Sequence, residues 1–145
     1  ASDVYKRQCK FHVHLRYIRY SRHGIYMATY LNMDLTLMRP LRLDDIFVGD
    51  YKDALTDLIW NQLMADNKVT THEALEDMGY ASTGDIAPTE NFYLSKEGIT
   101  FYYNVYEIAP YVMGATKITL SYEDIAHLMN GEFITLSSAI KADGE

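Results

Sequence analysis

The chain has 145 residues, of which 48% are hydrophobic and 23% are charged, a balance typical of one folded domain with a single core. Its formal net charge of −7 argues against a nucleic-acid partner, because phosphate binding requires an excess of lysine and arginine. The single cysteine, Cys9, excludes an internal disulfide and a cysteine-based zinc site, and no apolar run approaches the roughly 18 residues that span a membrane.

The first eight residues, ASDVYKRQ, fit no periodic pattern. We expect residues 1–8 to be non-native or disordered and to lie outside the fold. No export signal is visible in the sequence. The rest of the chain predicts one domain over residues 9–133 and a ragged tail over residues 134–145.

Two segments near the start alternate between apolar and polar residues, as strands do when one face is buried. They are residues 11–20 and residues 25–37, with Ser21 to Gly24 as a turn between them, and they predict a long antiparallel hairpin. In the second segment, one side carries Ile25, Met27, Leu31, Met33, Leu35 and Leu37, and the other carries Tyr26, Ala28, Tyr30, Asn32, Asp34 and Thr36.

Helical periodicity follows. Residues 51–65 place Leu55, Ile59 and Leu63 on one face and predict the main helix. Residues 71–78 predict a second, shorter helix that Thr70 or Thr71 caps and that Gly79 ends.

The last third of the chain predicts three strands and one helix. The strands are residues 91–94, 98–106 and 116–120. Ser121 caps a helix over residues 122–130, which Gly131 ends. The order β-β-α-α-β-β-β-α lacks alternating βα units, so we predict an α+β fold with a largely antiparallel β-sheet and helices packed on one face.

These segments carry a recognisable set of motifs. They include LRLDDIF at residues 41–47, NFYL at residues 91–94, YEIAPY at residues 106–111 with Gly114 after it, and ITLSY at residues 118–122. The set resembles the DUF3298 family, and the resemblance covers roughly residues 26–129. The family includes the RsiV-like sensor domain of a lysozyme-responsive anti-sigma factor and the C-terminal non-catalytic region of PdaC-type peptidoglycan deacetylases.

The resemblance implies a bacterial, extracytoplasmic domain of the cell envelope (in the periplasm, on the cell surface or secreted) that is used for binding. A lysozyme-like protein or a peptidoglycan fragment is the implied partner. The sequence shows neither a deacetylase domain nor a membrane anchor. The resemblance therefore does not imply deacetylase activity or anti-sigma activity for this chain.

The tyrosine-rich stretch from Asn91 to Ile125 supplies the candidate ligand-binding face. Its residues are Tyr102, Tyr106, Glu107, Tyr111 and Tyr122. Tyrosine beside a charge is common in binding hot spots. The alternative is architectural: Pro110 ends a strand, Gly114 permits a tight backbone, and Glu107 accepts backbone N–H groups. Exposure separates the two interpretations, because a binding corner has Tyr106 or Tyr111 open to solvent.

Candidates for catalysis and metal binding are weak. His12 and His14 share a strand face and are weak metal candidates, because no third ligand is evident nearby in sequence, although His23 lies past the turn. We expect no cofactor, no catalytic residue and a non-enzymatic binding domain. The alternative is a carbohydrate-active hydrolase or an accessory domain of a peptidoglycan deacetylase, which a deep pocket with two or more acids would favour.

Overall fold

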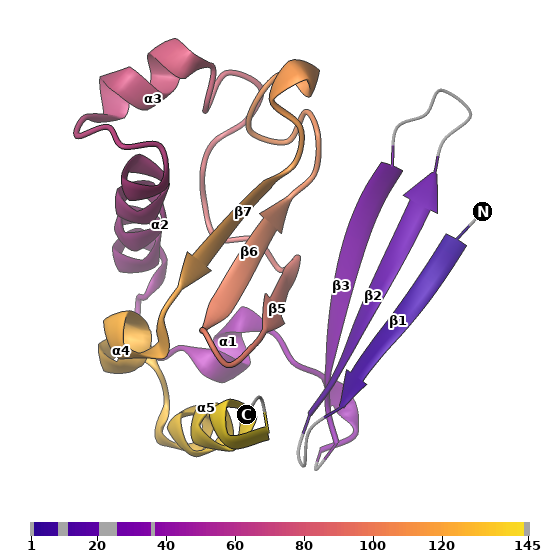
Figure 1. Ribbon diagram of the computed structural model, residues 1–145. Coiled ribbons are helices and arrows are strands. Elements are labelled where there is room, and N and C mark those ends of the chain that lie inside the picture. The colour runs from indigo at the N-terminus through magenta and orange to yellow at the C-terminus, as the bar shows by residue number, and fades with distance from the viewer. Residues whose placement is uncertain (1, 9–11, 21–25, 36, 144–145) are drawn as a thin grey trace.

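The computed structural model describes residues 2–8, 12–20, 26–35 and 37–143 (Figure 1). Helices and antiparallel sheets occupy separate parts of the chain, so the predicted α+β class is confirmed. The strands form two sheets, one with four strands and one with three, where the sequence predicted a single sheet.

The first sheet contains the predicted hairpin. Strands β2 (His12–Tyr20) and β3 (Tyr26–Asp34) pair antiparallel, and the turn between them lies outside the described residues. Strand β1 (Ser2–Gln8) pairs with β2, and the short β4 (Arg39–Pro40) pairs with the end of β3. Residues 2–8 therefore form a strand of this sheet, contrary to the expectation that residues 1–8 lie outside the fold.

The second sheet consists of β5 (Phe92–Leu94), β6 (Ile99–Tyr103) and β7 (Thr116–Leu120), in that order and antiparallel. The three predicted strands are thus confirmed, although β6 ends at Tyr103 and not at Tyr106 as predicted. Gly98 lies in the turn between β5 and β6 at φ +151°, and a Cβ there would be 1.9 Å from the carbonyl oxygen of Leu120. Only glycine fits this turn.

The helices are α1 (Leu43–Ile46), α2 (Lys52–Asp66), α3 (His72–Met78), α4 (Tyr122–Ile125) and α5 (Gly131–Asp143), with 3₁₀ turns η1 (Tyr111–Met113) and η2 (Ala126–Leu128). Two predicted caps are confirmed. The Thr71 hydroxyl accepts the N–H of Ala74 at 3.1 Å, and the Ser121 hydroxyl accepts the N–H of Asp124 at 3.2 Å. Gly79 ends α3 in a left-handed conformation, as expected.

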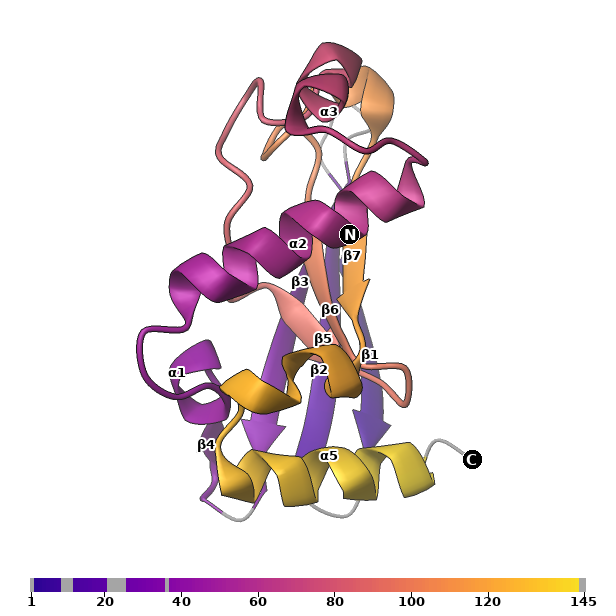
Figure 2. The same cartoon turned by 90° about the vertical axis from the view of Figure 1, so that its left-hand side faces the viewer.

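The three-stranded sheet lies in the middle of the molecule. Helix α2 crosses one face of it, and the first sheet covers the other face (Figures 1 and 2). Strand β6 is therefore buried along its whole length. Ile99 and Phe101 belong to the main core with Leu55 of α2, whereas Tyr102 packs with Tyr30 of the first sheet. This alternation is the period of two expected of a strand with two covered faces.

The buried face of β3 is not the face with the most apolar residues. Ala28, Tyr30 and Asn32 are at most 6% exposed, whereas Met27 and Leu31 are 45% and 42% exposed. The reason is a set of asparagine side chains that hold β3 against the second sheet. Asn91 accepts the N–H of Tyr30 at 2.7 Å, and Asn32 donates to the carbonyl of Phe92 at 2.8 Å.

The predicted tail after Phe133 was wrong, because Gly131 begins helix α5 instead of ending a helix. Asn130 caps α5: its side-chain oxygen accepts the N–H of Phe133 at 2.7 Å. Phe133 and Ile140, two turns apart, are 3% and 6% exposed and join the main core. Burial of this face stabilises the helix.

Candidate functional site

The connection between β6 and β7, residues 104–114, carries the most exposed aromatic side chains of the described chain, and we name it the tyrosine corner. Tyr106 and Tyr111 are 55% and 49% exposed, and Val112 is 90% exposed. The two tyrosine rings lie 5.7 Å apart between centroids with an interplanar angle of 30°. The corner therefore presents a paired aromatic surface to solvent, which was the observation required for a binding role.

The backbone of the corner is held in an unusual shape. Tyr106 has a φ of +71°, a left-handed conformation that costs a residue with a side chain about 1–2 kcal/mol. The following Ile108 and Ala109 are each 2% exposed and anchor the loop in the core. Strain that neighbouring contacts maintain in this way is found most often at functional sites.

Glu107 is part of the scaffold of the corner. Its carboxylate accepts the backbone N–H of Asn104 at 2.8 Å, and its own N–H donates to the Asn104 carbonyl at 3.1 Å. These two bonds close the turn that leads into the corner, as the architectural interpretation expected. The side chain of Asn104 in turn binds the backbone of Ala28 in β3.

The end of α3 and the loop that follows it pack closely against the corner. A Cβ on Gly84 would lie 2.2 Å from the carbonyl oxygen of Glu107, so the two backbones are in direct contact. A Cβ on Gly79 would lie 3.3 Å from the ring of Pro110. These two close approaches leave no space for larger residues and fix the position of the corner.

Tyr103, at the end of β6, ties the corner to the same loop. Its hydroxyl donates to the carbonyl oxygen of Ala87 at 2.5 Å. Burial raises the pKa of Tyr103 well above the ordinary tyrosine value, and the negative charge of Glu107 raises this pKa further. Tyr103 therefore stays protonated and acts as a structural donor.

Two of the five residues predicted for the binding face lie elsewhere. Tyr102 is 1% exposed, because it lies between the two sheets, where the amino group of Lys117 is 5.9 Å from its ring centroid. Tyr122 is 5% exposed, and its hydroxyl donates to the carbonyl of Ser95 at 2.6 Å. Only Tyr106, Glu107 and Tyr111 are brought together.

The metal candidates remain a prediction. His12 and His14 lie on β2, and their side chains are outside the described part of the chain. Among the side chains that the structure does describe, no group of three or more histidine, cysteine, aspartate or glutamate residues is arranged to hold a metal ion. No helix in the described part is long and apolar enough to cross a bilayer.

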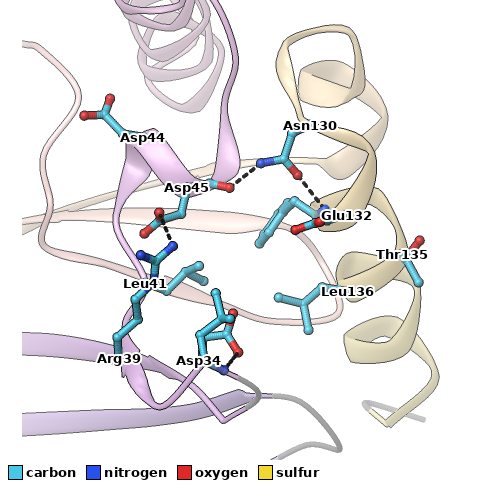
Figure 3. A pocket seen from close by; sticks show the side chains of 11 residues that line it. Asp34, Arg39, Leu41, Asp44, Asp45, Asn130, Glu132, Thr135 and Leu136 are labelled. Carbon is cyan, nitrogen blue, oxygen red and sulfur yellow. Dashed lines mark hydrogen bonds and ion pairs between the residues drawn. The ribbon is translucent and has the colours of Figure 1, made fainter.

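A cavity of about 560 Å³ lies at the other end of the described fold, where the end of β3, β4, α1 and α5 meet (Figure 3). Its size is in the range of ligand-binding pockets. Arg39 and Asp45 form an ion pair at 3.1 Å on the wall opposite α5 (Figure 3). The residues that line it are Asp34, Leu37, Arg39, Leu41, Asp44, Asp45, Asn130, Glu132, Phe133, Thr135 and Leu136.

The cavity was missed because half of its wall comes from residues that were taken for a helix end and a tail. The signal that could have found it is the Asn130-Gly131-Glu132 sequence, which combines a preferred N-cap residue with an acidic first turn. Phe133, Leu136 and Ile140 then follow at helical spacing.

A family model described as a protein of unknown function, DUF3298, matches residues 44–123, which is more than half of the chain. The chain belongs to the DUF3298 family. The matched region contains the whole tyrosine corner, but most of the wall of the cavity lies outside it.

Solved structures of DUF3298 proteins share the fold. A family member from Bacteroides fragilis NCTC 9343 is 56% identical over 97% of this chain, with a TM-score of 0.82. A DUF3298 protein from Pseudomonas aeruginosa PAO1 is 17% identical over 91% of this chain, with a TM-score of 0.69, a likeness of fold alone. The chain spans 58% and 62% of the lengths of these two structures. No curated protein matches it.

Proposed function

We propose that this DUF3298 domain is a non-enzymatic binding module that works in the bacterial cell envelope, outside the cytoplasm. Its ligand is a protein such as lysozyme, and a cell-wall glycan is the second candidate. The exposed ring pair of Tyr106 and Tyr111 is the observation that carries the proposal.

The properties of the corner suit recognition. Tyrosine combines a large apolar ring with a polar hydroxyl, and it is enriched among the residues that dominate binding energy. The corner is held in place by Glu107 and by the buried Ile108 and Ala109, so little ordering is needed when a ligand binds. A pre-formed aromatic surface of this kind fits a protein surface or the apolar face of a sugar ring.

The charge of the chain favours the protein ligand. A net charge of −7 attracts a basic protein over a long range and speeds the encounter with it. A lysozyme is such a partner, and a lysozyme-responsive sensor is among the members of the family that the sequence resembles. A neutral glycan gains nothing from this charge.

The proposal can be tested by calorimetric titration with a lysozyme and, separately, with soluble muropeptides. Replacement of Tyr106 and Tyr111 together by alanine is expected to weaken binding of the true ligand by about 30-fold, since hot-spot truncations cost roughly 2 kcal/mol or more. Ile134→Ala serves as the control, because Ile134 is a comparably exposed apolar residue on α5.

Two results would contradict the proposal. One is the absence of binding to both ligands at high micromolar concentration. The other is a double variant that binds as tightly as the unchanged domain. The envelope location has its own test, which is fractionation of the source cell followed by detection of the domain with an antibody.

The cavity supports the alternative, a glycan hydrolase, because several carboxylates line it. Three of these carboxylates already have partners. Asp45 forms an ion pair with Arg39, Asp44 accepts a hydrogen bond from the hydroxyl of Tyr51, and Asp34 accepts one from the N–H of Leu37. Such bonds suit a structural role better than proton transfer. The hydrolase would be established if the domain released reducing sugar from peptidoglycan and the Glu132→Gln variant did not.

A further inference from the structure

The residues that line the cavity between β4, α1 and α5 carry a net negative charge. Four carboxylates and one guanidinium line it, which leaves three negative charges. Asp45 is neutralised by Arg39, and the carboxylate of Asp44 points away from α5 (Figure 3). Asp34 lies on the strand side of the cavity and Glu132 on the helix side.

The floor of the cavity is apolar. Leu41 follows β4, Leu136 projects from α5, and their side chains approach each other from opposite sides (Figure 3). Phe133, which is 3% exposed, also lines the cavity. A ligand that fits both the floor and the rim must have an apolar stem and a positively charged end.

We propose that this cavity binds the side chain of an arginine or lysine on a partner polypeptide. The methylene groups of these side chains lie along apolar surfaces while the charged group stays at the polar rim. The carboxylate of Glu132 is available for the cation, since no hydrogen bond or ion pair of this side chain is found among the described residues. Arginine fits best, because its guanidinium binds a carboxylate through two parallel hydrogen bonds.

The cavity exists before a ligand arrives. Asn130 joins its two walls: its backbone N–H donates to the carbonyl of Ile46 at 2.9 Å, and its side-chain amide donates to the carbonyl of Asp45. The same side chain caps α5. The helix wall is therefore fixed to α1, and binding does not require the walls to move together.

The surroundings argue against other small ligands. An anion would face a net negative wall. A metal ion prefers several carboxylates that converge on one point, and the described residues contain no such group. The proposal is independent of the tyrosine corner, because the cavity and the corner share no residue.

The test is a nuclear magnetic resonance titration of the ¹⁵N-labelled chain with the peptide N-acetyl-Gly-Arg-Gly-amide. The matched peptide carries citrulline, which has the shape of arginine without its charge. We expect the arginine peptide alone to shift the amide signals of Glu132, Phe133 and Leu136, and added salt to reduce the effect. Glu132→Gln is expected to weaken binding at least threefold, and Glu76→Gln, an exposed change on α3, is expected to leave it unchanged.

Three results would overturn the proposal. The first is the absence of shifts up to about 10 mM peptide, a range that detects a Kd near 1 mM. The second is equal binding of the citrulline peptide. The third is binding of free 1-butylguanidine without binding of the peptide, which would assign the cavity to a small cation instead of a polypeptide.

Discussion

The side-chain amide of Asn104 grips the backbone of Ala28, which is 76 residues away in the chain. Its oxygen accepts the N–H of Ala28 at 2.8 Å, and its nitrogen donates to the carbonyl of the same residue at 3.0 Å. Both residues are buried, at 5% and 0% exposure. The amide of this one asparagine thus forms the two backbone hydrogen bonds that a neighbouring strand would form, and it joins the tyrosine corner to the first sheet.

Replacement of Asn104 by alanine is expected to lower the free energy of unfolding by about 2 kcal/mol, because it leaves the buried N–H of Ala28 without its acceptor. Urea unfolding measures this loss. Asn61→Ala, an exposed change on α2, is the control and is expected to change stability by less than about 0.5 kcal/mol. Equal stabilities of the two variants would show that Asn104 does not hold the sheets together.

Replacement of Tyr106 by glycine is expected to raise the melting temperature and to weaken ligand binding. Glycine adopts a φ of +71° without strain, so the free energy of unfolding is expected to rise by about 1 kcal/mol. The same change removes one of the two exposed rings. Thermal unfolding and calorimetric titration measure the two effects. Tyr111→Ala also removes a ring, but at a residue without positive φ, so it is expected to weaken binding without gaining stability. A less stable glycine variant would contradict the argument.

Tyr103 is expected to make stability fall in alkali. Because its pKa in the folded state lies above the ordinary value of 10.0, the folded protein keeps this proton where the unfolded chain releases it. The stabilisation is complete below pH 10 and is lost as the pH rises further. Tyr103→Phe, which cannot ionise, is expected to be about 1 kcal/mol less stable at neutral pH and to approach the unchanged protein in alkali.

Denaturant unfolding at several pH values between 8 and about 11 tests this behaviour. Tyr111→Phe is the control, since its ring is half exposed at the corner. Parallel profiles for the unchanged protein and Tyr103→Phe would disprove the role of this hydroxyl.

Trp60 and His72 join helices α2 and α3. Their rings are stacked with centroids 4.3 Å apart and planes 13° apart. Replacement of His72 by alanine is expected to lower the free energy of unfolding by about 0.5–1 kcal/mol. Because Trp60 is the sole tryptophan of the chain, its fluorescence reports directly on the contact. Glu73→Ala, at the next exposed position, should leave the emission spectrum unchanged, and an unchanged spectrum for His72→Ala would refute the contact.

Local chemistry made much of the fold predictable. Thr71 and Ser121 were predicted as caps because their hydroxyls can accept N–H groups three residues later, and both do so. Strand β7 has the predicted bounds, and Gly79 ends α3 as expected. Each of these features depends on residues a few positions apart, which a single sequence displays directly.

Features that depend on distant partners were not predictable. The buried side of β3 is decided by Asn91 and Asn104, more than sixty residues later in the chain. Asn130 also illustrates the limit, because asparagine before glycine occurs at both ends of helices, and the packing of Phe133 decides which end it is.

The candidate site was predictable in part. Tyr106, Glu107 and Tyr111 lie in one short loop, so sequence proximity placed them together correctly. Tyr102 and Tyr122 were grouped with them because the composition of the segment does not reveal which layer covers each residue. The first sheet covers Tyr102, and the turn at Ser95 covers Tyr122.

The asparagine contacts also determine how this domain can meet another protein. Four backbone groups of β3 are occupied. Asn104 binds the N–H and C=O of Ala28, Asn91 accepts the N–H of Tyr30, and the C=O of Asn32 accepts the N–H of Leu41. These four backbone groups of β3 are therefore not free to pair with an extended peptide. Their occupation discourages fibrous self-association at this part of the edge and favours recognition through side-chain surfaces.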